Sequence, residues 1–364
     1  MSFSLRPHLS GMSPYSPGKP IDEVKRELGL ERVIKLASNE NPLGPSPKAV
    51  EAVKKAAENL HLYPDAAAYS LKQAISETFD LDPSLLMIGN GSDELIHYLC
   101  QCFLDGPETQ MMMGNPSFVR YESGGQLADS QVIKVPLNSE WRHDVEAMAA
   151  ALTPQTRLVF IANPNNPTGT MVSKAEVDWL LERLPSGCVL VLDEAYVEFA
   201  EGIENFPLSL DYIRKGAPVV GLRTFSKAYG LAGIRVGWGA APRAIIDAVD
   251  RIREPFNVNI LAQSAAIAAL GDPGHVAATV ALNRQGLERI ESVCKELGFS
   301  VVPSLANFAC IDLGKPARPL FDALLKEGII ARCGDVLGMP NHLRVSIGTE
   351  EEMGVFLEAF KRLA

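Results

Sequence analysis

The segment Thr224-Phe225-Ser226-Lys227-Ala228-Tyr229-Gly230-Leu231-Ala232-Gly233-Ile234-Arg235 places one lysine among small hydroxyl residues, with an arginine eight positions later. A lysine amine forms a Schiff base only when part of it is unprotonated, so burial or a cationic neighbour such as Arg235 must lower its pKa. Thr224 and Ser226 can donate to a phosphate, and Arg235 can bind the same phosphate through two N–H groups. The segment therefore suits a covalently held phosphorylated aldehyde, which is pyridoxal phosphate. A solvated surface lysine is the alternative.

The segment Val189-Leu190-Val191-Leu192-Asp193-Glu194-Ala195-Tyr196 is apolar until its acidic end. Such a run is typical of a strand buried on both faces, and Asp193 then stands at the carboxyl end, where open α/β sheets bind ligands. A carboxylate there can bond the protonated pyridine nitrogen of the cofactor and keep the ring able to accept electrons. The Tyr196 hydroxyl can reach the phenolic oxygen of the ring, although a core tyrosine is the alternative.

Residues 158–169 run from an apolar strand into a loop with the sequence Asn-Pro-Asn-Asn-Pro-Thr-Gly. A loop so rich in Asn, Pro and Gly holds side-chain amides rigidly. Asn166 can then donate to the same phenolic oxygen as Tyr196, which favours the unprotonated imine. Alone, this loop would be an ordinary turn.

Residues 87–96 are the fourth segment, which combines a short strand, a glycine-rich turn and a helix that opens with Ser92 and Asp93. Backbone N–H groups at such a helix start point at an anion. Glu94 stands where a dinucleotide-binding motif needs its third glycine, so we expect a single phosphate here. An ordinary helix N-cap is the alternative.

In this order, the segments resemble those of the fold-type I aminotransferases, and more narrowly those of the histidinol-phosphate aminotransferases. The resemblance covers nearly the whole chain, and the ordered set is far more specific than any single motif. It also includes Pro14-Tyr15-Ser16-Pro17-Gly18-Lys19-Pro20, Ala37-Ser38-Asn39-Glu40-Asn41-Pro42-Leu43-Gly44, Tyr63-Pro64-Asp65, Asn115-Pro116-Ser117-Phe118 and Leu343-Arg344-Val345-Ser346-Ile347-Gly348-Thr349.

The resemblance implies a role for each matching residue around the cofactor. Lys227 forms the Schiff base and acts as general base, and Asp193 binds the pyridine nitrogen. Asn166 and Tyr196 bind the ring oxygen, and Phe118 stacks on the ring at a position where many relatives have tyrosine. The residues implied at the phosphate are Ser92, Asp93, Thr224, Ser226 and Arg235.

The resemblance also implies a homodimer with shared active sites, in which Tyr63 reaches the cofactor phosphate of the partner subunit. Arg344, assisted by Arg332, is expected to bind the substrate phosphate or the carboxylate of glutamate, and Tyr15 and Asn39 line the same pocket. Two guanidinium groups can hold either anion, so their chemistry leaves the substrate class open. For Arg332, a surface salt bridge is the alternative.

The implied reaction converts L-histidinol phosphate and 2-oxoglutarate to imidazole acetol phosphate and L-glutamate, a step of histidine biosynthesis. Two rival enzymes remain open at this stage, an aromatic or broad-specificity amino-acid aminotransferase and a threonine-phosphate decarboxylase. A non-catalytic cofactor-binding regulator is disfavoured, because we expect no spare length for a DNA-binding segment.

Composition narrows the remaining classes. With 364 residues and 47% hydrophobic content, the chain can bury a large core and form two domains. A net charge of −10 argues against a nucleic-acid partner. The six cysteines and six histidines show no metal-binding spacing, so we expect no metal. Without a signal peptide or a long apolar run, we expect a cytoplasmic protein that does not bind membranes.

The fold class predicted is α/β, because helices alternate with short apolar strands from about residue 46 to residue 250. The resemblance implies the fold-type I arrangement, a mainly parallel seven-stranded sheet between helices, plus a smaller α+β C-terminal domain. We expect an N-terminal arm and part of the small domain in residues 1–45, the large cofactor domain in 46–255 and the small domain in 256–364. Residues 6–20 are predicted to be an extended arm.

Overall fold

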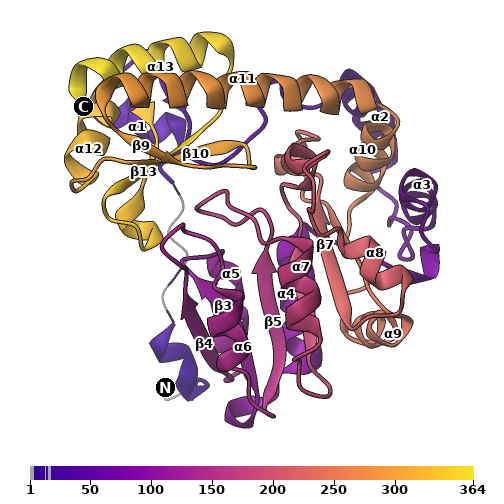
Figure 1. The fold of residues 1–364 in the computed structure, drawn as a ribbon. Coiled ribbons are helices and arrows are strands. Elements are labelled where there is room, and N and C mark those ends of the chain that lie inside the picture. Colours follow the sequence, from indigo (N-terminus) through magenta and orange to yellow (C-terminus); the bar gives the residue numbers. More distant parts are fainter. Residues whose placement is uncertain (1–3, 13, 15–17) are drawn as a thin grey trace.

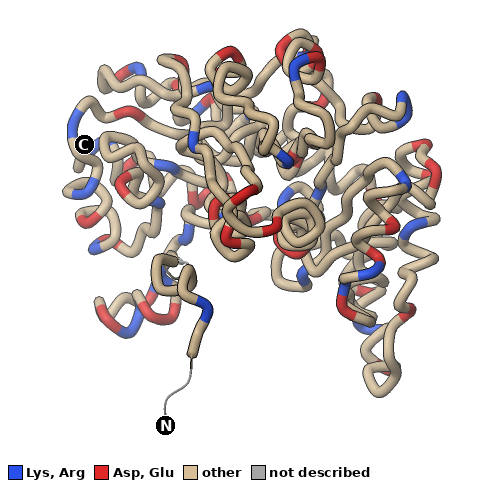
Figure 2. The backbone as a smooth tube through the Cα atoms, turned by 90° about the horizontal axis from the view of Figure 1, so that it is seen from below, with Lys and Arg blue, Asp and Glu red and all other residues tan. Residues whose placement is uncertain are grey.

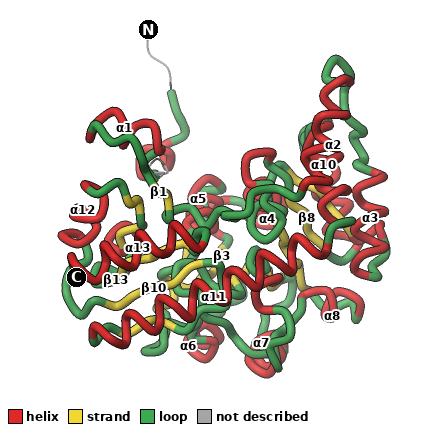
Figure 3. Tube along the Cα trace, turned by 90° about the horizontal axis from the view of Figure 1, so that it is seen from above, coloured by secondary structure: helices red, strands yellow, loops and turns green. Residues whose placement is uncertain are grey.

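The computed structural model describes residues 4–12, 14 and 18–364. A large part is built on one central sheet, and a smaller part lies above it (Figure 1). The long helix α11 (Pro273–Leu297) joins the two, running from α10 (Ile260–Leu270) to the strands of the smaller part, as Figure 3 shows from above.

The central sheet has seven strands in the order β2-β8-β7-β6-β5-β3-β4. Only β8 runs antiparallel to its neighbours, so the prediction of a mainly parallel seven-stranded sheet is confirmed. The strands are β2 (Leu86–Gly89), β3 (Gln110–Asn115), β4 (Gln131–Pro136), β5 (Thr156–Ala162), β6 (Val189–Asp193), β7 (Val219–Thr224) and β8 (Gly237–Ala240).

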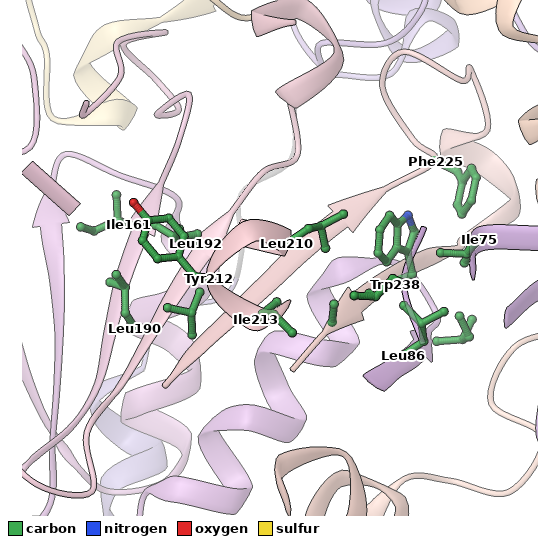
Figure 4. Close-up of a cluster of buried hydrophobic side chains, with 14 of the residues drawn as sticks. Ile75, Leu86, Ile161, Leu190, Leu192, Leu210, Tyr212, Ile213, Phe225 and Trp238 are labelled. Atoms are coloured by element: carbon green, nitrogen blue, oxygen red, sulfur yellow. The ribbon is translucent and has the colours of Figure 1, made fainter. Parts of the chain in front are cut away.

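Helices cover both faces of this sheet, which is why its strands are apolar at nearly every position. In β6, Leu190 and Leu192 face one core, and Val189 and Val191 face the other. Figure 4 shows the first core, with Tyr212 of α8 beside the strand side chains. The helices of that face are α2 (Pro47–Ala56), α3 (Tyr69–Phe79), α6 (Val145–Ala150), α7 (Lys174–Leu181), α8 (Ser209–Arg214) and α10. Those of the other face are α4 (Ser92–Phe103), α5 (Val119–Leu127) and α9 (Arg243–Ile252).

The smaller part is built on an antiparallel sheet in the order β12-β13-β10-β9. A separate pair, β1 (Ile34–Lys35) with β11 (Ile329–Ile330), brings an early segment into the same core. The other elements are α1 (Ile21–Leu28), β9 (Ser300–Val302), β10 (Phe308–Asp312), α12 (Arg318–Lys326), β12 (Arg332–Cys333), β13 (His342–Ser346) and α13 (Glu350–Leu363). Short 3-10 helices lie at η1 (Pro7–Gly11), η2 (Ala57–Asn59), η3 (Pro83–Leu85), η4 (Gly106–Glu108), η5 (Val197–Ala200), η6 (Ala232–Ile234) and η7 (Gly334–Leu337).

Two sequence expectations differ from the packing observed. Residues 256–270 were expected in the small domain, but α10 packs on α2 and α3, and Ala262 and Ala265 belong to the large core. The arm expected to be extended contains η1, which packs on α5 with His8 Nδ1 3.5 Å from Asp129. The predicted domain bounds otherwise stay a prediction.

Acidic and basic residues are interspersed along the backbone (Figure 2). In the part of the chain that the structure describes, no single helix is long and apolar enough to cross a membrane. Only α10 and α11 taken together meet those requirements, and they are bent by 79°.

Candidate active site

The sequence segments singled out above meet at one edge of the central sheet. Thr224, at the carboxyl end of β7, lies opposite Gly237, which in turn lies opposite Gly89 at the end of β2. Asp193 ends the neighbouring strand β6, beside Ala162 at the end of β5. This shared edge brings residues separated by more than 100 positions in sequence into one site.

Lys227 lies in the loop after β7, and its amino group is buried although the residue retains partial exposure. Nζ donates to the carbonyl oxygen of Ser38 at 3.3 Å and lies 5.8 Å from the centre of the Tyr196 ring. Burial, followed by the cation of Arg344, lowers the pKa of Lys227 to about 8. Arg235, the neighbour suggested by the sequence, contributes less.

A lowered lysine pKa predicts a shifted labelling profile. In cofactor-free protein, we expect modification of Lys227 by an amine reagent to rise through pH 8, because only the neutral amine reacts. The protein is exposed to the reagent for a short time at each pH, and peptide mass spectrometry then measures the modified fraction of Lys227. In Arg344→Gln the transition should move to higher pH, since a cation that disfavours protonation is gone. A wild-type transition above pH 10 would contradict the shift.

Asp193 is buried at the end of β6, and each of its carboxylate oxygens accepts one hydrogen bond. The Tyr121 hydroxyl donates to Oδ2 at 2.7 Å, and the Ala195 N–H donates to Oδ1 at 3.1 Å. Burial raises the pKa of Asp193 to about 6, although these two donors act in the opposite direction. Within the described residues, no cationic side chain lies within salt-bridge distance of this carboxylate. A buried carboxylate of this kind is suited to a cationic partner from outside the chain.

Several hydrogen-bond donors lie close together at the start of α4. Arg235 Nη2 lies 3.7 Å from Asp93. Gly91 has φ 80°, and a Cβ there would lie 2.5 Å from Arg235 Nη2, so only glycine allows this approach. A Cβ at Gly237 would lie 2.5 Å from the backbone nitrogen of Ser92, so β8 also passes close beneath the helix start.

The hydroxyl residues of the lysine segment complete this group. Thr224 and Ser226 are both buried, and the Ser226 N–H donates to Thr224 Oγ1 at 3.1 Å. Together with the first amides of α4 and the Arg235 guanidinium, they surround the start of a helix that attracts anions.

Asn39 connects the smaller part of the molecule to Tyr196. Its side-chain N–H donates to the Tyr196 hydroxyl oxygen at 2.9 Å, and its Oδ1 accepts from Ser346 Oγ at 2.9 Å. Asn39 has φ 53°, a left-handed conformation that asparagine tolerates better than most residues. The structure therefore places two predicted site residues, Asn39 and Tyr196, in direct contact.

Arg344 is buried on β13, directly opposite Arg332 on β12. Nη1 donates to Asn166 Oδ1 at 2.6 Å, and Nη2 donates to the Ala37 carbonyl oxygen at 2.7 Å. The expected anion-binding arginine is thus tied to the expected ring-oxygen ligand, and its charge acts on Lys227.

Of the other predicted residues, Tyr63 lies apart from this group, and Phe118 contacts it through Tyr121. Tyr63 is 81% exposed and stacks on Phe256 with ring centres 4.6 Å apart. Phe118 caps α5 and meets Tyr121 edge-on at 5.6 Å. Tyr15 lies outside the described residues. Among the residues that are described, no three His, Cys, Asp or Glu side chains are grouped as a metal ion requires.

Two contributors were missed by sequence reasoning, Tyr121 and Ser346. Tyr121 follows Phe118 by three positions, so one helical turn brings both to the same face of α5, and this spacing could have indicated it. Ser346 follows Arg344 by two positions on a strand and so lies on the same face of the sheet.

Residues 31–360 match the family described as aminotransferase class I and II. The chain belongs to this family. This aminotransferase is 47% identical, over 98% of its length and 92% of the other, to the histidinol-phosphate aminotransferase of Moorella thermoacetica. It is 44% identical, over 98% of both chains, to histidinol-phosphate aminotransferase 2 of Carboxydothermus hydrogenoformans.

Solved structures agree with this membership. The histidinol-phosphate aminotransferase of Sinorhizobium meliloti in complex with pyridoxal 5'-phosphate is 28% identical, with a TM-score of 0.91 over 100% of this chain and 98% of that one. Aspartate aminotransferase of Thermus thermophilus with maleate, 22% identical over 100% of both chains, has a TM-score of 0.85 and shows the likeness of fold. The predicted fold-type I architecture of this aminotransferase is confirmed.

The residues of this aminotransferase fit pyridoxal 5'-phosphate. The buried carboxylate of Asp193 has a donor on each oxygen and no cationic partner among the described residues, as a pyridinium ligand requires. The lowered pKa of Lys227 suits a covalent bond to an aldehyde. Arg235 and the start of α4 supply the donors that a phosphate needs.

Proposed function

We propose that this aminotransferase uses pyridoxal 5'-phosphate to convert L-histidinol phosphate and 2-oxoglutarate to imidazole acetol phosphate and L-glutamate, in histidine biosynthesis. The observation that carries the substrate assignment is the 44 to 47% identity, over 98% of the chain, to relatives that bear this activity in their names. The buried Arg344 beside Lys227 supports an anionic substrate.

The residues of the chain divide the work around the reacting atoms. When bound, the cofactor supplies an aldehyde that takes up the amino group and a ring that accepts the electrons of the substrate α-carbon. Lys227 holds the cofactor covalently and, once released as a neutral amine, takes the proton from that carbon. Asp193 holds the ring nitrogen in its protonated form. Tyr196 and Asn166 bind the ring oxygen, and Phe118 stacks on the ring.

The remaining roles concern the two anions. Arg235 and the start of α4 bind the cofactor phosphate, with Ser92, Asp93, Thr224 and Ser226. Arg344 and Arg332 bind the substrate phosphate or, in the second half-reaction, the carboxylate of 2-oxoglutarate, and Asn39 and Tyr15 line that pocket. Because Arg344 already contacts Asn166, substrate binding at one end is coupled to the ring-oxygen contacts at the other.

Arg344→Lys tests the role of the guanidinium without removing its charge. We expect the concentration of histidinol phosphate at half-saturation to rise about 10- to 100-fold, because an ammonium cannot make the two parallel bonds of a guanidinium. Single-turnover kinetics followed by cofactor absorbance measure this, with maximal rate and saturation fitted separately. Unchanged saturation for both histidinol phosphate and glutamate would remove Arg344 from the substrate site.

We further propose a homodimer whose subunits share their active sites. Tyr63 lies on the surface near other exposed apolar side chains, those of Leu60 and Leu62. An apolar hollow of about 310 Å³ lies between α2 and residues 230–234 and would be filled by a second copy. In this assembly Tyr63 reaches the cofactor phosphate of the partner subunit.

Mixed dimers test whether Tyr63 acts across the interface. When Lys227→Ala and Tyr63→Ala chains are co-expressed in equal amounts, half of the dimers are hybrid, and each hybrid contains one site without either change. Activity should then recover to about one quarter of the wild-type value, above that of either variant alone. If Tyr63 serves its own subunit, the mixture shows only the average of the two variants.

A cytoplasmic location also belongs to this proposal. All six cysteines are free thiols, and five of them are buried, as expected of a protein from a reducing compartment. Fractionation of cells followed by activity measurement tests the location.

The substrate assignment is tested by mixing the holoprotein separately with histidinol phosphate, phenylalanine and threonine phosphate, without a 2-oxoacid. Rapid loss of the absorbance of the lysine-bound cofactor with histidinol phosphate supports the proposal. Preference for phenylalanine would move the assignment to an aromatic aminotransferase. Carbon dioxide release from threonine phosphate would move it to a decarboxylase.

A further inference from the structure

We infer that Tyr121 is a positioning residue for Asp193. The Tyr121 hydroxyl keeps the Asp193 carboxylate ionised and aimed at the cofactor, so that the proton shared by the carboxylate and the ring nitrogen stays on the nitrogen. This inference rests on the proposed function, since it deepens the role assigned to Asp193. It adds a residue that neither the motifs nor the expected ligand set contains.

The position of the Tyr121 hydroxyl is fixed from several sides. The residue has no exposed surface, and its ring stacks on Phe160 with centres 4.6 Å apart and planes 15° apart. Phe118 meets the same ring edge-on at 5.6 Å. With the ring enclosed in this way, the hydroxyl points at Asp193 Oδ2, 2.7 Å away.

Tyr121 can only act as a donor in this bond. Burial and the charge of Asp193 raise the pKa of Tyr121 well above its ordinary value, so the phenol keeps its proton at any physiological pH. A hydrogen bond donated to a carboxylate stabilises its charged form and lowers its affinity for a proton. Tyr121 therefore opposes the burial that would neutralise Asp193.

The arrangement of donors leaves room for the cofactor. Each carboxylate oxygen has two lone pairs, and the Tyr121 hydroxyl and the Ala195 N–H occupy one on each oxygen. A lone pair on either oxygen can still accept from a pyridinium N–H. If the Tyr121 donor is lost, Asp193 becomes a stronger base than in wild type. The ratio of protonated carboxylate to protonated ring nitrogen then rises by about 10- to 100-fold.

The same side chain serves two cofactor contacts. Phe118, which is expected to stack on the ring, packs on the edge of Tyr121, while Asp193 is bonded by its hydroxyl. One buried tyrosine therefore packs against the side chain expected to stack on the ring and bonds the carboxylate expected to hold the ring nitrogen. Removing only the hydroxyl separates these two effects, because the ring packing remains.

The test measures the protonation of the ring nitrogen directly, in holoprotein loaded with cofactor labelled with nitrogen-15 at that atom. In wild type we expect the nitrogen NMR shift of a protonated pyridine near neutral pH. Tyr121→Phe should move it toward the neutral value. The matched control is Tyr212→Phe, which removes a similar bond from a buried tyrosine to Asp178 at 2.8 Å on α7, and it should leave the shift unchanged.

Two further variants separate the failure of this inference from that of the proposed function. Asp193→Asn should give the neutral value whatever residue 121 is, so adding Tyr121→Phe to it should change nothing more. A Tyr121→Phe shift equal to wild type, or an added effect in the Asp193→Asn background, overturns the role of Tyr121 alone. A wild-type shift in Asp193→Asn overturns the role proposed for Asp193 itself.

Discussion

Lys227→Ala should yield a folded protein that binds the cofactor reversibly and transaminates at least about 10,000-fold more slowly than wild type. The amine is both the covalent attachment point and the base, and no other lysine lies in the lysine segment. Burial disfavours the charged form of the Lys227 amine, as its lowered pKa shows. Replacing it with alanine should therefore not lower the stability of the fold. Dialysis followed by an absorbance scan measures covalent retention, and single-turnover kinetics measure the rate.

Lys72→Ala is the matched control for this loss. Lys72 lies on α3, and burial lowers its pKa as well, but it is not part of the sheet edge that carries the site. This variant should keep both the covalent chromophore and the rate. If Lys227→Ala retained a dialysis-resistant chromophore, or turned over within 10-fold of wild type, the role of Lys227 would be wrong.

The largest expected effect on stability comes from Arg223→Met, which should lower the free energy of unfolding by about 3 to 5 kcal/mol. Arg223 Nε donates to Glu194 at 2.8 Å, and both side chains are buried beneath the site. The guanidinium also lies 5.0 Å from the Phe79 ring and 5.4 Å from the Trp238 ring, which methionine can partly replace. The loss therefore reflects the unpaired charge of Glu194.

The loss in Arg223→Met should depend on pH. Burial raises the pKa of Glu198 to about 7, and Arg223 partly opposes this. A carboxyl group with a raised folded pKa is neutral at low pH and destabilises the fold as pH rises above its unfolded value. Without Arg223 the destabilisation by Glu198 grows. The difference in unfolding free energy between wild type and Arg223→Met should therefore be larger at pH 8 than at pH 5.5.

Urea unfolding of the cofactor-free proteins at both pH values measures this without a contribution from ligand binding. The control is Arg223→Met combined with Glu194→Gln, which should recover part of the loss because no charge remains unpaired. A loss below about 1 kcal/mol at pH 8 would mean that the pair contributes no more than a surface ion pair.

Local patterns and the resemblance together predicted most of the fold, and they also indicated the residues proposed around the cofactor. The run at residues 189–193 is continuous in apolar residues because β6 is covered on both faces, so its strand end, and with it Asp193, could be placed from sequence alone. The lysine segment itself indicated Arg235, which lies beside the start of α4, and the resemblance supplied Arg344, which lies on β13 and contacts Asn166.

Contacts between distant segments could not be predicted in the same way. Tyr121 and Asp193 are 72 positions apart, and Asn39 and Tyr196 are 157 apart, so each bond depends on how helices and sheets are packed. The assignment of α10 to the small domain differs from the structure for a similar reason. An Ala-rich helix without a distinct polar face does not indicate the core against which it packs.

The bond from the Asn39 N–H to Ser346 Oγ, 2.8 Å long, joins residues 307 positions apart. Arg344 likewise donates to the carbonyl oxygen of Ala37, and the next carbonyl, that of Ser38, accepts from Lys227. The site is therefore assembled from both ends of the chain, and a nascent polypeptide on the ribosome cannot complete it before its last strand has emerged. A chain truncated before β13 would lack both of these bonds to the segment around Asn39.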